Sequence, residues 1–528
     1  MSEDAVFARA AVAAPNTLAA QAGRDILVQG GNAIEAMVAM AASIAVVYPH
    51  MNSIGGDGFW LIRDARGRAR AIEACGFAGA GATIDTYEKF GETIPTRGPR
   101  AALTVPGAVG GWALALEYAA ALGGKMPLRI LLERAVSQAR EGVPISQSEA
   151  RYQPKEAADL IAAPGFKATY RPDGEPPKAG EIRKQTRLGD TLEHIGRAAL
   201  TDFYRGDVAR EIAADLEDLG APVTRADLAA FSARGREPLA LRLTKATLYN
   251  TPIPTQGVAS LILLGLYERL GVARPEGFSH AHALIEATKR AFRVRDDVCF
   301  DYNLSEQDFS TLLSPAFLES EATKINKKRA ASWPLAEEEG DTVWMGAIDN
   351  AGLAVSYIQS VYWEYGSGCV LDRTGVLMQN RGIAFTLDRK SPRGLKPGRR
   401  PFHTLNPPLA VFDDGRVLSY GSMGGDGQPQ FQAQVFARIA AGAGPTDAVS
   451  APRHIWGRLW GEPSASVKVE ADYDDATASA LARAGHEVER RGSHERDMFG
   501  HAGALLRTVK GHIAAAHDPR SDGGAEGV

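Results

Sequence analysis

The sequence predicts a protein of the α+β class, with helices prominent early in the chain and strands in its last third. Two observations carry this prediction. Apolar residues recur with helical periodicity from 127 to 219. After position 342, short apolar runs separated by turn residues are typical of strands. No internal repeat, low-complexity block or linker separates the chain into parts, so we expect one folded unit.

Length and composition limit the possible functions. A chain of 528 residues could hold three or four domains. With 45% hydrophobic and 23% charged residues, the composition is that of an ordinary globular protein with an ample core. The net charge of −4 gives no reason to expect nucleic acid or an anionic membrane as a partner.

Cysteines and the N-terminus suggest the compartment. Cys75, Cys299 and Cys369 match no metal-ligand spacing, so we predict neither a metal nor another cofactor. An odd, sparse set of cysteines fits a reducing compartment. The acidic first residues show no export signal, and the apolar run 36–47 is too short to span a bilayer. We therefore expect a cytoplasmic protein without a membrane partner.

The first elements follow from caps and glycines. Residues 16–29 predict a helix that ends at Gly30-Gly31, and a second helix, capped near Asn32, runs to Val47. This second helix is apolar on most sides, which predicts burial between layers. A glycine turn at 55–58 then leads into a strand at 59–62, and by themselves these glycines indicate turn chemistry rather than function.

The stretch that points to chemistry surrounds Thr342. A strand-like run begins at this residue, ends in a turn at 349–352, and is followed by a second strand at 353–360. A lone Thr before a strand is most often a hydrogen-bonded strand or surface residue. Here three further motifs follow it in order: Tyr-Gly-Ser-Gly at 365–368, Thr-Gly-Val-Leu at 374–377, and Gln379-Asn380.

With these motifs the chain resembles the γ-glutamyltranspeptidase family, a branch of the N-terminal-nucleophile hydrolases. The resemblance extends from about residue 19 to 524, with the motifs in the family's order. It implies a four-layer αββα sandwich in which two packed sheets lie between helix layers. It also implies one precursor cut into a large (α) subunit, residues 1–341, and a small (β) subunit, residues 342–528, which together form a single domain. A homodimer of such αβ units is one open arrangement.

The resemblance assigns the cleavage site and the nucleophile. It implies that Thr342 attacks the Asp341 carbonyl, that an N-to-O acyl shift follows, and that ester hydrolysis releases the two chains. An N-terminal Thr carries its own general base, the α-amino group. The reference pKa of this amine is roughly 7.7–8.0, close to the working pH at which a base is most useful.

Two further catalytic elements are implied. Ser360 occupies the place of the family's Thr that assists the nucleophile. Gly424 and Gly425 match a glycine pair, and consecutive glycines can point two N–H groups at one spot, as an oxyanion hole requires. A phosphate-binding loop is the rival interpretation, but no Lys follows these glycines.

The substrate-binding positions depart from the family. Arg381 and Ala384 replace two groups that hold an α-amino group, and Cys75 replaces the Arg that holds an α-carboxylate. Arg381 would repel an amine and bind a carboxylate, although an ion pair with a neighbouring acid is the plainer interpretation of this residue. The remaining predicted substrate-binding residues stand at positions that match the family's pocket: Tyr362, Asn380, His403 and Thr404.

Three hypotheses follow. The first is a self-cleaving amidohydrolase for a small carboxylated amide, similar to the family's oxamate amidohydrolases of purine breakdown, which release oxalate and ammonia. The second is a glutathione hydrolase or γ-glutamyltransferase with a rebuilt pocket. The third is an uncleaved, inactive relative kept for binding. We also expect residues 312–340 to form a flexible tail freed by cleavage, and the last residues to be loose.

Overall fold

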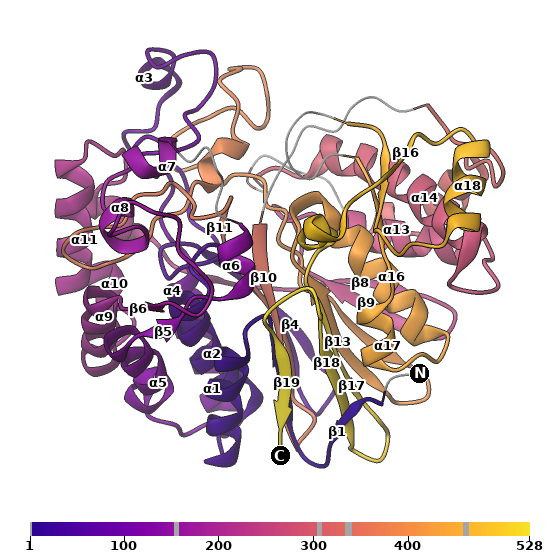
Figure 1. Ribbon diagram of the computed structural model, residues 1–528, viewed down its shortest axis with the longest axis horizontal. Helices are drawn as coiled ribbons and strands as arrows, with labels where there is room; N and C mark the ends of the chain where they lie inside the picture. The colour runs from indigo at the N-terminus through magenta and orange to yellow at the C-terminus, as the bar shows by residue number, and fades with distance from the viewer. Residues whose placement is uncertain (1–2, 153–157, 302, 304–308, 333–340, 458–463) are drawn as a thin grey trace.

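Two seven-stranded sheets pack face to face and helices cover their outer sides (Figure 1). This arrangement is that of a computed structural model, which describes residues 3–152, 158–301, 303, 309–332, 341–457 and 464–528, with Asp341 described by its backbone alone. The predicted α+β class and the four-layer αββα sandwich are both confirmed.

The first sheet carries the predicted nucleophile on a central strand. Its order is β19-β2-β10-β11-β3-β4-β7, and all neighbours are antiparallel. Its strands are β2 (Ala11–Ala14), β3 (Asp57–Arg63), β4 (Ala69–Ala74), β7 (Arg234–Arg236), β10 (Asp341–Ile348), β11 (Ala354–Tyr362) and β19 (Gly524–Gly527).

The second sheet has the order β1-β18-β17-β13-β12-β9-β8 and is also antiparallel throughout. Its strands are β1 (Ala5–Phe7), β8 (Leu239–Arg242), β9 (Ala246–Asn250), β12 (Leu409–Phe412), β13 (Val417–Ser422), β17 (Ala502–Arg507) and β18 (Ile513–His517). Short pairings outside the two sheets join β5 (Val143–Pro144) to β6 (Ile182–Arg183), and β15 (Val467–Val469) to β14 (His454–Trp456) and β16 (Val488–Arg490).

One helix layer packs on the first sheet. Its main helices are α1 (Thr17–Val28), α2 (Ala33–Val47), α4 (Ala108–Ala121), α5 (Leu128–Glu141), α9 (Thr186–Ala198) and α11 (Asp207–Asp218). The shorter helices of this half are α3 (Ile84–Tyr87), α6 (Gln147–Arg151), α7 (Ala158–Ala162), α8 (Phe166–Tyr170), α10 (Asp202–Arg205) and α12 (Arg225–Ala230).

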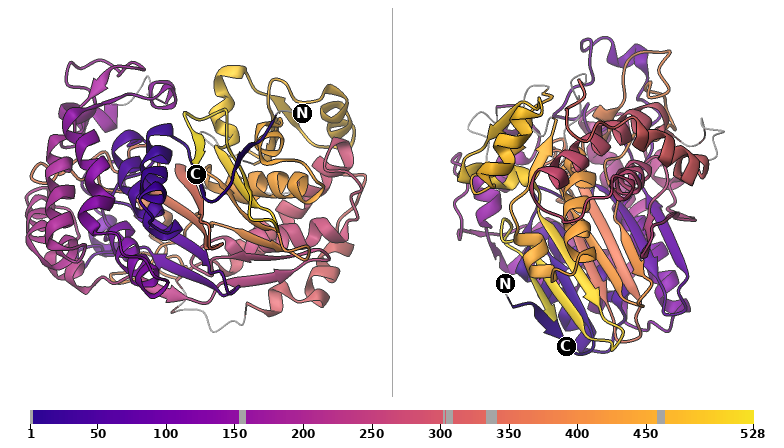
Figure 2. Two further views of the ribbon diagram at one scale, coloured as in Figure 1. Left: turned by 90° about the horizontal axis from the view of Figure 1, so that it is seen from below. Right: turned by 90° about the vertical axis from the view of Figure 1, so that its right-hand side faces the viewer.

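The other helix layer packs on the second sheet and lies in front of the strands in the right-hand view of Figure 2. It contains α13 (Gly257–Arg269), α14 (Gly277–Val298), α15 (Pro315–Thr323), α16 (Gln428–Ala440), α17 (Pro445–Ser450) and α18 (Asp475–Arg483). Apolar side chains fill all three interfaces between the four layers. Trp344 and Phe59 belong to the core shared by the two sheets, so the strand of Thr342 is anchored there.

The two predicted helices at the start of the chain are confirmed, and so is the predicted cap near Asn32. Asn16 caps α1 by accepting the N–H of Leu18. Asn32 and Glu35 form a reciprocal capping box on α2. Every residue of α2 is buried, because this helix lies between the first sheet and neighbouring helices, including α1 and α5.

Two predictions about chain ends were wrong where the structure describes them. Part of the expected flexible tail, 312–332, contains α15, whose Leu318 is fully buried, and residues 333–340 lie outside the described part. The last residues are not loose, since β19 pairs with β2. Both segments carry apolar or small residues that complete a layer, a tertiary effect that local composition does not reveal. In the described part of the chain, no helix is long and apolar enough to cross a membrane.

Candidate active site

The predicted nucleophile lies on β10 and is almost fully buried, with 1% of its surface exposed. Its hydroxyl donates a hydrogen bond to Ser360 Oγ over 3.3 Å. It also accepts one from Gln428 Nε2 over 3.3 Å. The structure therefore brings together two predicted catalytic residues that are 18 positions apart, and it adds a third side chain that sequence reasoning missed.

An irregularity in strand pairing aims these hydroxyls at each other. Asp341 pairs with Tyr362, and Val343 pairs with Gln359, with a register shift in between. One residue on β10 thus faces two on β11. Such bulges are common beside active sites, where they redirect a side chain.

Tyr362 links the nucleophile region to the predicted substrate pocket. Its N–H donates to Ser360 Oγ over 2.9 Å. Its φ of 83° is in the left-handed region, which costs a non-glycine residue about 1–3 kcal/mol and often marks a functional site. Its ring stacks on Arg381, whose guanidinium carbon lies 3.3 Å from the ring centroid. The same residue therefore contacts both the helper hydroxyl and the predicted carboxylate-binding cation.

Arg381 is 1% exposed and begins a short 3-10 turn, Arg381–Ala384. Its Nη1 donates to Thr404 Oγ1 over 3.3 Å. Its Nε and Nη2 have no hydrogen-bond partner among the described residues, and no carboxylate there pairs with it within 4 Å. An ion pair with a neighbouring acid, the plainer interpretation, is thus not what the described structure contains. Two parallel donors on one edge of the guanidinium remain for a ligand.

The glycine pair follows β13 and is held from two sides. Gly424 and Gly425 have φ values of 116° and 49°, a backbone region that favours glycine. Gln256 donates through Nε2 to the Gly425 carbonyl, and Arg295 forms a buried ion pair of 2.6 Å with Asp426. Gly425 opens a 3-10 turn, so its N–H has no partner within that turn. These contacts hold the loop in one conformation, and its use as an oxyanion hole stays a prediction.

Gly425→Ala should lower turnover strongly, because a Cβ at this φ rotates the turn away from its present geometry. Loss of one oxyanion donor typically costs roughly 2.7–4 kcal/mol, or about 10²–10³ in kcat. The measurement is steady-state ammonia release by cleaved protein, with the melting temperature as a check of folding. A folded Gly425→Ala enzyme with parental kcat would remove this loop from the site.

His403 and Asp57 form a buried polar pair beside Arg381. His403 Nε2 lies 3.6 Å from Asp57 Oδ2, and among the described residues neither atom has a hydrogen-bond partner. Asp57 Oδ1 accepts the N–H groups of Gly76 and Gly107, both over 3.1 Å. Burial, aided by the positive charge of Arg381, lowers the pKa of His403 well below its usual value, which keeps it neutral.

Burial also raises the pKa of Asp57 from 3.8 to about 7, with hydrogen bonds and the Arg381 charge opposing the shift. A raised carboxyl pKa means that the folded state binds the proton more tightly than the unfolded state. The stability contributed by Asp57 is therefore present at low pH and is lost as pH rises from about 4 through 7.

Asp57→Asn removes this titration while keeping the Oδ1 acceptor. We expect the unfolding free energy of Asp57→Asn, relative to the parent, to increase between pH 5 and pH 8. The limit over this pH range is about 3 kcal/mol, since about two pKa units of the shift lie above pH 5 and one pKa unit corresponds to about 1.4 kcal/mol. Denaturant unfolding at several pH values checks this, with exposed Asp388→Asn as the control. A pH-independent difference would show that Asp57 does not titrate in this range.

The other residues predicted for the substrate pocket differ in their hydrogen-bond partners. The carbonyl of Thr404 accepts from Gln256 Nε2 over 2.7 Å, which ties this residue to the glycine loop. Asn380 uses its side chain on the backbone, accepting from Trp363 N and donating to Thr96 O, so the geometry favours a positioning role. Cys75 is 1% exposed in the core between the sheets.

Asp57, Gln256 and Gln428 are the site residues that sequence reasoning did not select. Asp57 lies opposite Ser360 in the β3–β11 register, and hence on the same face of the sheet. Its signal was an acid within a glycine turn. The signal for Gln428 was a run of four alternating glutamines at 428–434, polar residues where an apolar helix face is expected.

One group of possible metal ligands lies outside this site. Among the described residues, His282, Glu286 and His486 place ligand atoms within 4.8 Å of one another. The carbonyl of Asn326 can only accept, so His282 Nε2 donates to it, and His282 Nδ1 shares a hydrogen bond of 2.8 Å with His486 Nε2. Lys289 Nζ forms an ion pair of 2.7 Å with Glu286 Oε1. The arrangement favours a hydrogen-bonded anchor for the segment around 326–331 over a metal centre.

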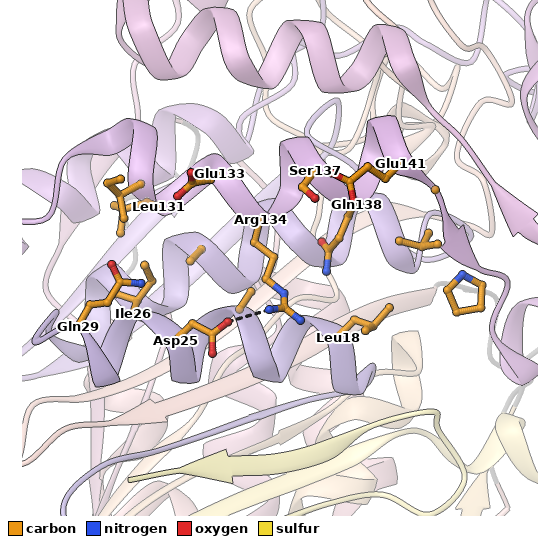
Figure 3. A pocket seen from close by; sticks show the side chains of 16 residues that line it. Leu18, Asp25, Ile26, Gln29, Leu131, Glu133, Arg134, Ser137, Gln138 and Glu141 are labelled. Carbon is orange, nitrogen blue, oxygen red and sulfur yellow. Dashed lines mark hydrogen bonds and ion pairs between the residues drawn. The ribbon is translucent and has the colours of Figure 1, made fainter.

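A separate pocket lies between α1 and α5 (Figure 3). Its volume is about 470 Å³, and Arg134 reaches across it to Asp25, with a 2.8 Å ion pair. None of the predicted catalytic or substrate-binding residues lines it.

The fold and the position of the site define a class. A four-layer αββα sandwich with a candidate Thr nucleophile at the start of a central strand is the architecture of N-terminal-nucleophile hydrolases. The sequence profile of the gamma-glutamyltranspeptidase family matches residues 19–528. The chain belongs to the γ-glutamyltranspeptidase family.

Relatives in this family carry different names. The chain is 46% identical to the oxamate amidohydrolase proenzyme of Klebsiella pneumoniae, with 97% of each chain covered. It is 35% identical to a glutathione hydrolase-like proenzyme of Bacillus subtilis, with both chains fully covered. A crystal structure of cephalosporin acylase from Bacillus halodurans has a TM-score of 0.90 at 31% identity, covering 100% of this chain and 97% of that one.

Proposed function

We propose that the protein is a proenzyme that cuts itself between Asp341 and Thr342, and whose new N-terminal Thr342 hydrolyses a small carboxylated amide. Oxamate is the substrate that fits best, with oxalate and ammonia as products. Because the names of relatives differ in substrate, family membership alone does not choose among amides. The choice rests on the pocket.

The observation that carries the proposal is the unpaired edge of Arg381. Its Nε and Nη2 donors are buried without a partner among the described residues, which is costly unless a ligand satisfies them. Two parallel N–H groups match a carboxylate in a bidentate pair. Tyr362 stacks on the guanidinium and also bonds to Ser360, so a carboxylate held there would lie close to Thr342. This closeness suits an acid whose amide is adjacent to its carboxylate.

The chemistry follows from the same groups. Thr342 Oγ would attack the Asp341 carbonyl carbon, and the peptide nitrogen would leave as the amine of Thr342 once an ester has formed. Water would then hydrolyse this ester, giving a carboxylate at Asp341. In the mature enzyme the amine would take the hydroxyl proton, Oγ would add to the amide carbon, and ammonia would leave with that proton. Water would release oxalate from the second ester.

The test is the turnover of three compounds by cleaved protein, followed as ammonia release for oxamate and oxamide and as glutamate release for glutathione. We expect oxamate to have the highest kcat/KM, because oxamide lacks the carboxylate. Glutathione should be poor, because Cys75 and Ala384 offer a glutamyl group no ionic partner. If glutathione is the best substrate, the small-acid proposal is wrong and the glutathione hydrolase alternative replaces it. If the purified chain is uncut and inactive, the binding-paralogue alternative replaces both.

A further inference from the structure

Gln428 is a fully buried glutamine in the first turn of α16, directly after the glycine loop. Burying an amide is unfavourable unless its donors and acceptors are paired. Gln428 donates to Thr342 Oγ1 over 3.3 Å, and its Oε1 accepts from Asn406 Nδ2 over 3.2 Å. The side chain therefore connects the predicted nucleophile to a second buried amide.

The network fixes which end of the Gln428 amide faces Thr342. The carbonyl of Thr404 can only accept, and Asn406 Nδ2 lies 2.8 Å from it, so this atom is an NH₂ group. Asn406 Oδ1 in turn accepts the hydroxyl of Ser260 over 2.7 Å. Because the NH₂ of Asn406 also faces Gln428, the atom of Gln428 on that side is its oxygen. Its NH₂ group must then point to Thr342.

A donor at this place has a defined effect on the hydroxyl. Gln428 is a donor and cannot take the proton of Thr342, so this proton points to Ser360 in the uncut chain. After cleavage the same proton is available to the α-amine of Thr342, the general base. It can stabilise the negative charge that develops on Oγ as the proton leaves. The same oxygen reacts in self-cleavage and in substrate hydrolysis, so one donor would serve both reactions.

We propose that Gln428 is a catalytic residue that donates a hydrogen bond to the nucleophilic oxygen of Thr342 in both self-cleavage and amide hydrolysis. The assignment rests on the proposed function of Thr342. It goes beyond it by placing a side-chain donor on the nucleophile itself, distinct from the glycine loop, which would serve the substrate carbonyl oxygen. The polar network also joins this donor to Thr404, which holds Arg381.

Two variants and one control test it. Gln428→Leu removes the donor, and Gln428→Glu keeps the shape while an ionised carboxylate cannot donate. Gln434→Leu is the matched control, since Gln434 is a buried glutamine of the same helix that bonds instead to the carbonyls of Gln430 and His454. For each protein the rate of appearance of the two fragments is measured first. The kcat and KM for oxamate are then measured on cleaved material.

We expect both Gln428 variants to cleave themselves and turn over oxamate on the order of 10–100-fold more slowly, because a hydrogen bond to a charged group contributes roughly 1.5–3 kcal/mol. KM should change less than about threefold, because Gln428 does not hold the carboxylate. Gln434→Leu should cleave and react like the parent. Suppose that the parent protein cleaves itself and hydrolyses oxamate. Gln428→Leu with the rates of the parent, or Gln434→Leu with rates as low as those of Gln428→Leu, would then overturn the role of Gln428 and leave the proposed function intact. A parent that is not cut at Thr342 would instead overturn the proposed function.

Discussion

Thr342→Ala protein should remain one full-length chain and should release no ammonia from oxamate. The physical reason is that one oxygen performs two tasks, attack on the Asp341 carbonyl and attack on the substrate amide. Removing a hydrolase nucleophile can cost on the order of 10⁶ in kcat, and here the general base would also be missing, because an uncut chain has no α-amine at this position. The measurements are a denaturing gel, intact mass and ammonia release.

Thr342→Ser is the matched control for this experiment, since it keeps the hydroxyl and loses only a methyl group. It should still yield fragments of 1–341 and 342–528, at a reduced rate. N-terminal sequencing of the small fragment locates the cut. A cut at another bond, or activity in the uncut Thr342→Ala chain, would contradict the assignment of the nucleophile. The melting temperature of each variant confirms that the fold is retained.

Arg381→Gln should separate substrate recognition from maturation. A charge-assisted hydrogen bond contributes roughly 1.5–3 kcal/mol, so kcat/KM for oxamate should fall by about 10–150-fold. Self-cleavage should be spared, because the Asp341–Thr342 bond is attacked without a free carboxylate in the pocket. The kcat/KM for oxamide, which has no carboxylate, should change little. Steady-state kinetics on both amides and a fragment time course provide the comparison.

Arg381→Lys is the informative control, because it keeps the positive charge but loses the two-donor edge. The kcat/KM of Arg381→Lys for oxamate should lie between the values of the parent and of Arg381→Gln. The stability of ligand-free protein gives an independent readout. Removing a buried cation with unpaired donors should leave the melting temperature of Arg381→Gln equal to or above that of the parent. An equal loss on oxamate and oxamide would show that Arg381 does not bind the carboxylate.

Local signals predicted much of the fold correctly. The stop at Gly30-Gly31 and the cap near Asn32 located the boundary between α1 and α2, and the almost wholly apolar pattern of α2 predicted its burial between layers. These features depend on neighbours within a turn or two of helix, so the order of residues is sufficient. The strand at β10 was equally plain, because its apolar run is bounded by polar residues and a turn.

Contacts between distant segments were not predictable from local pattern. The last strand, β19, has no distinctive composition, and it is a strand because β2 offers an unpaired edge. The segment around Leu318 resembles a charged tail but closes a layer against α13. In both cases the stabilising surface belongs to an element outside the local stretch of sequence.

The candidate site divides in the same way. The sequence by itself determined the candidates for the reacting groups, since Thr342, Ser360, Arg381 and the glycine pair each stand in a recognisable motif. Only the tertiary structure decided how they combine: a register shift turns Thr342 toward Ser360, and Arg381 is left with an unpaired edge. It also brought in Asp57 and Gln428, whose surroundings come from other strands and loops. Hydrogen bonding and burial are properties of assembled neighbours, and no stretch of sequence encodes them alone.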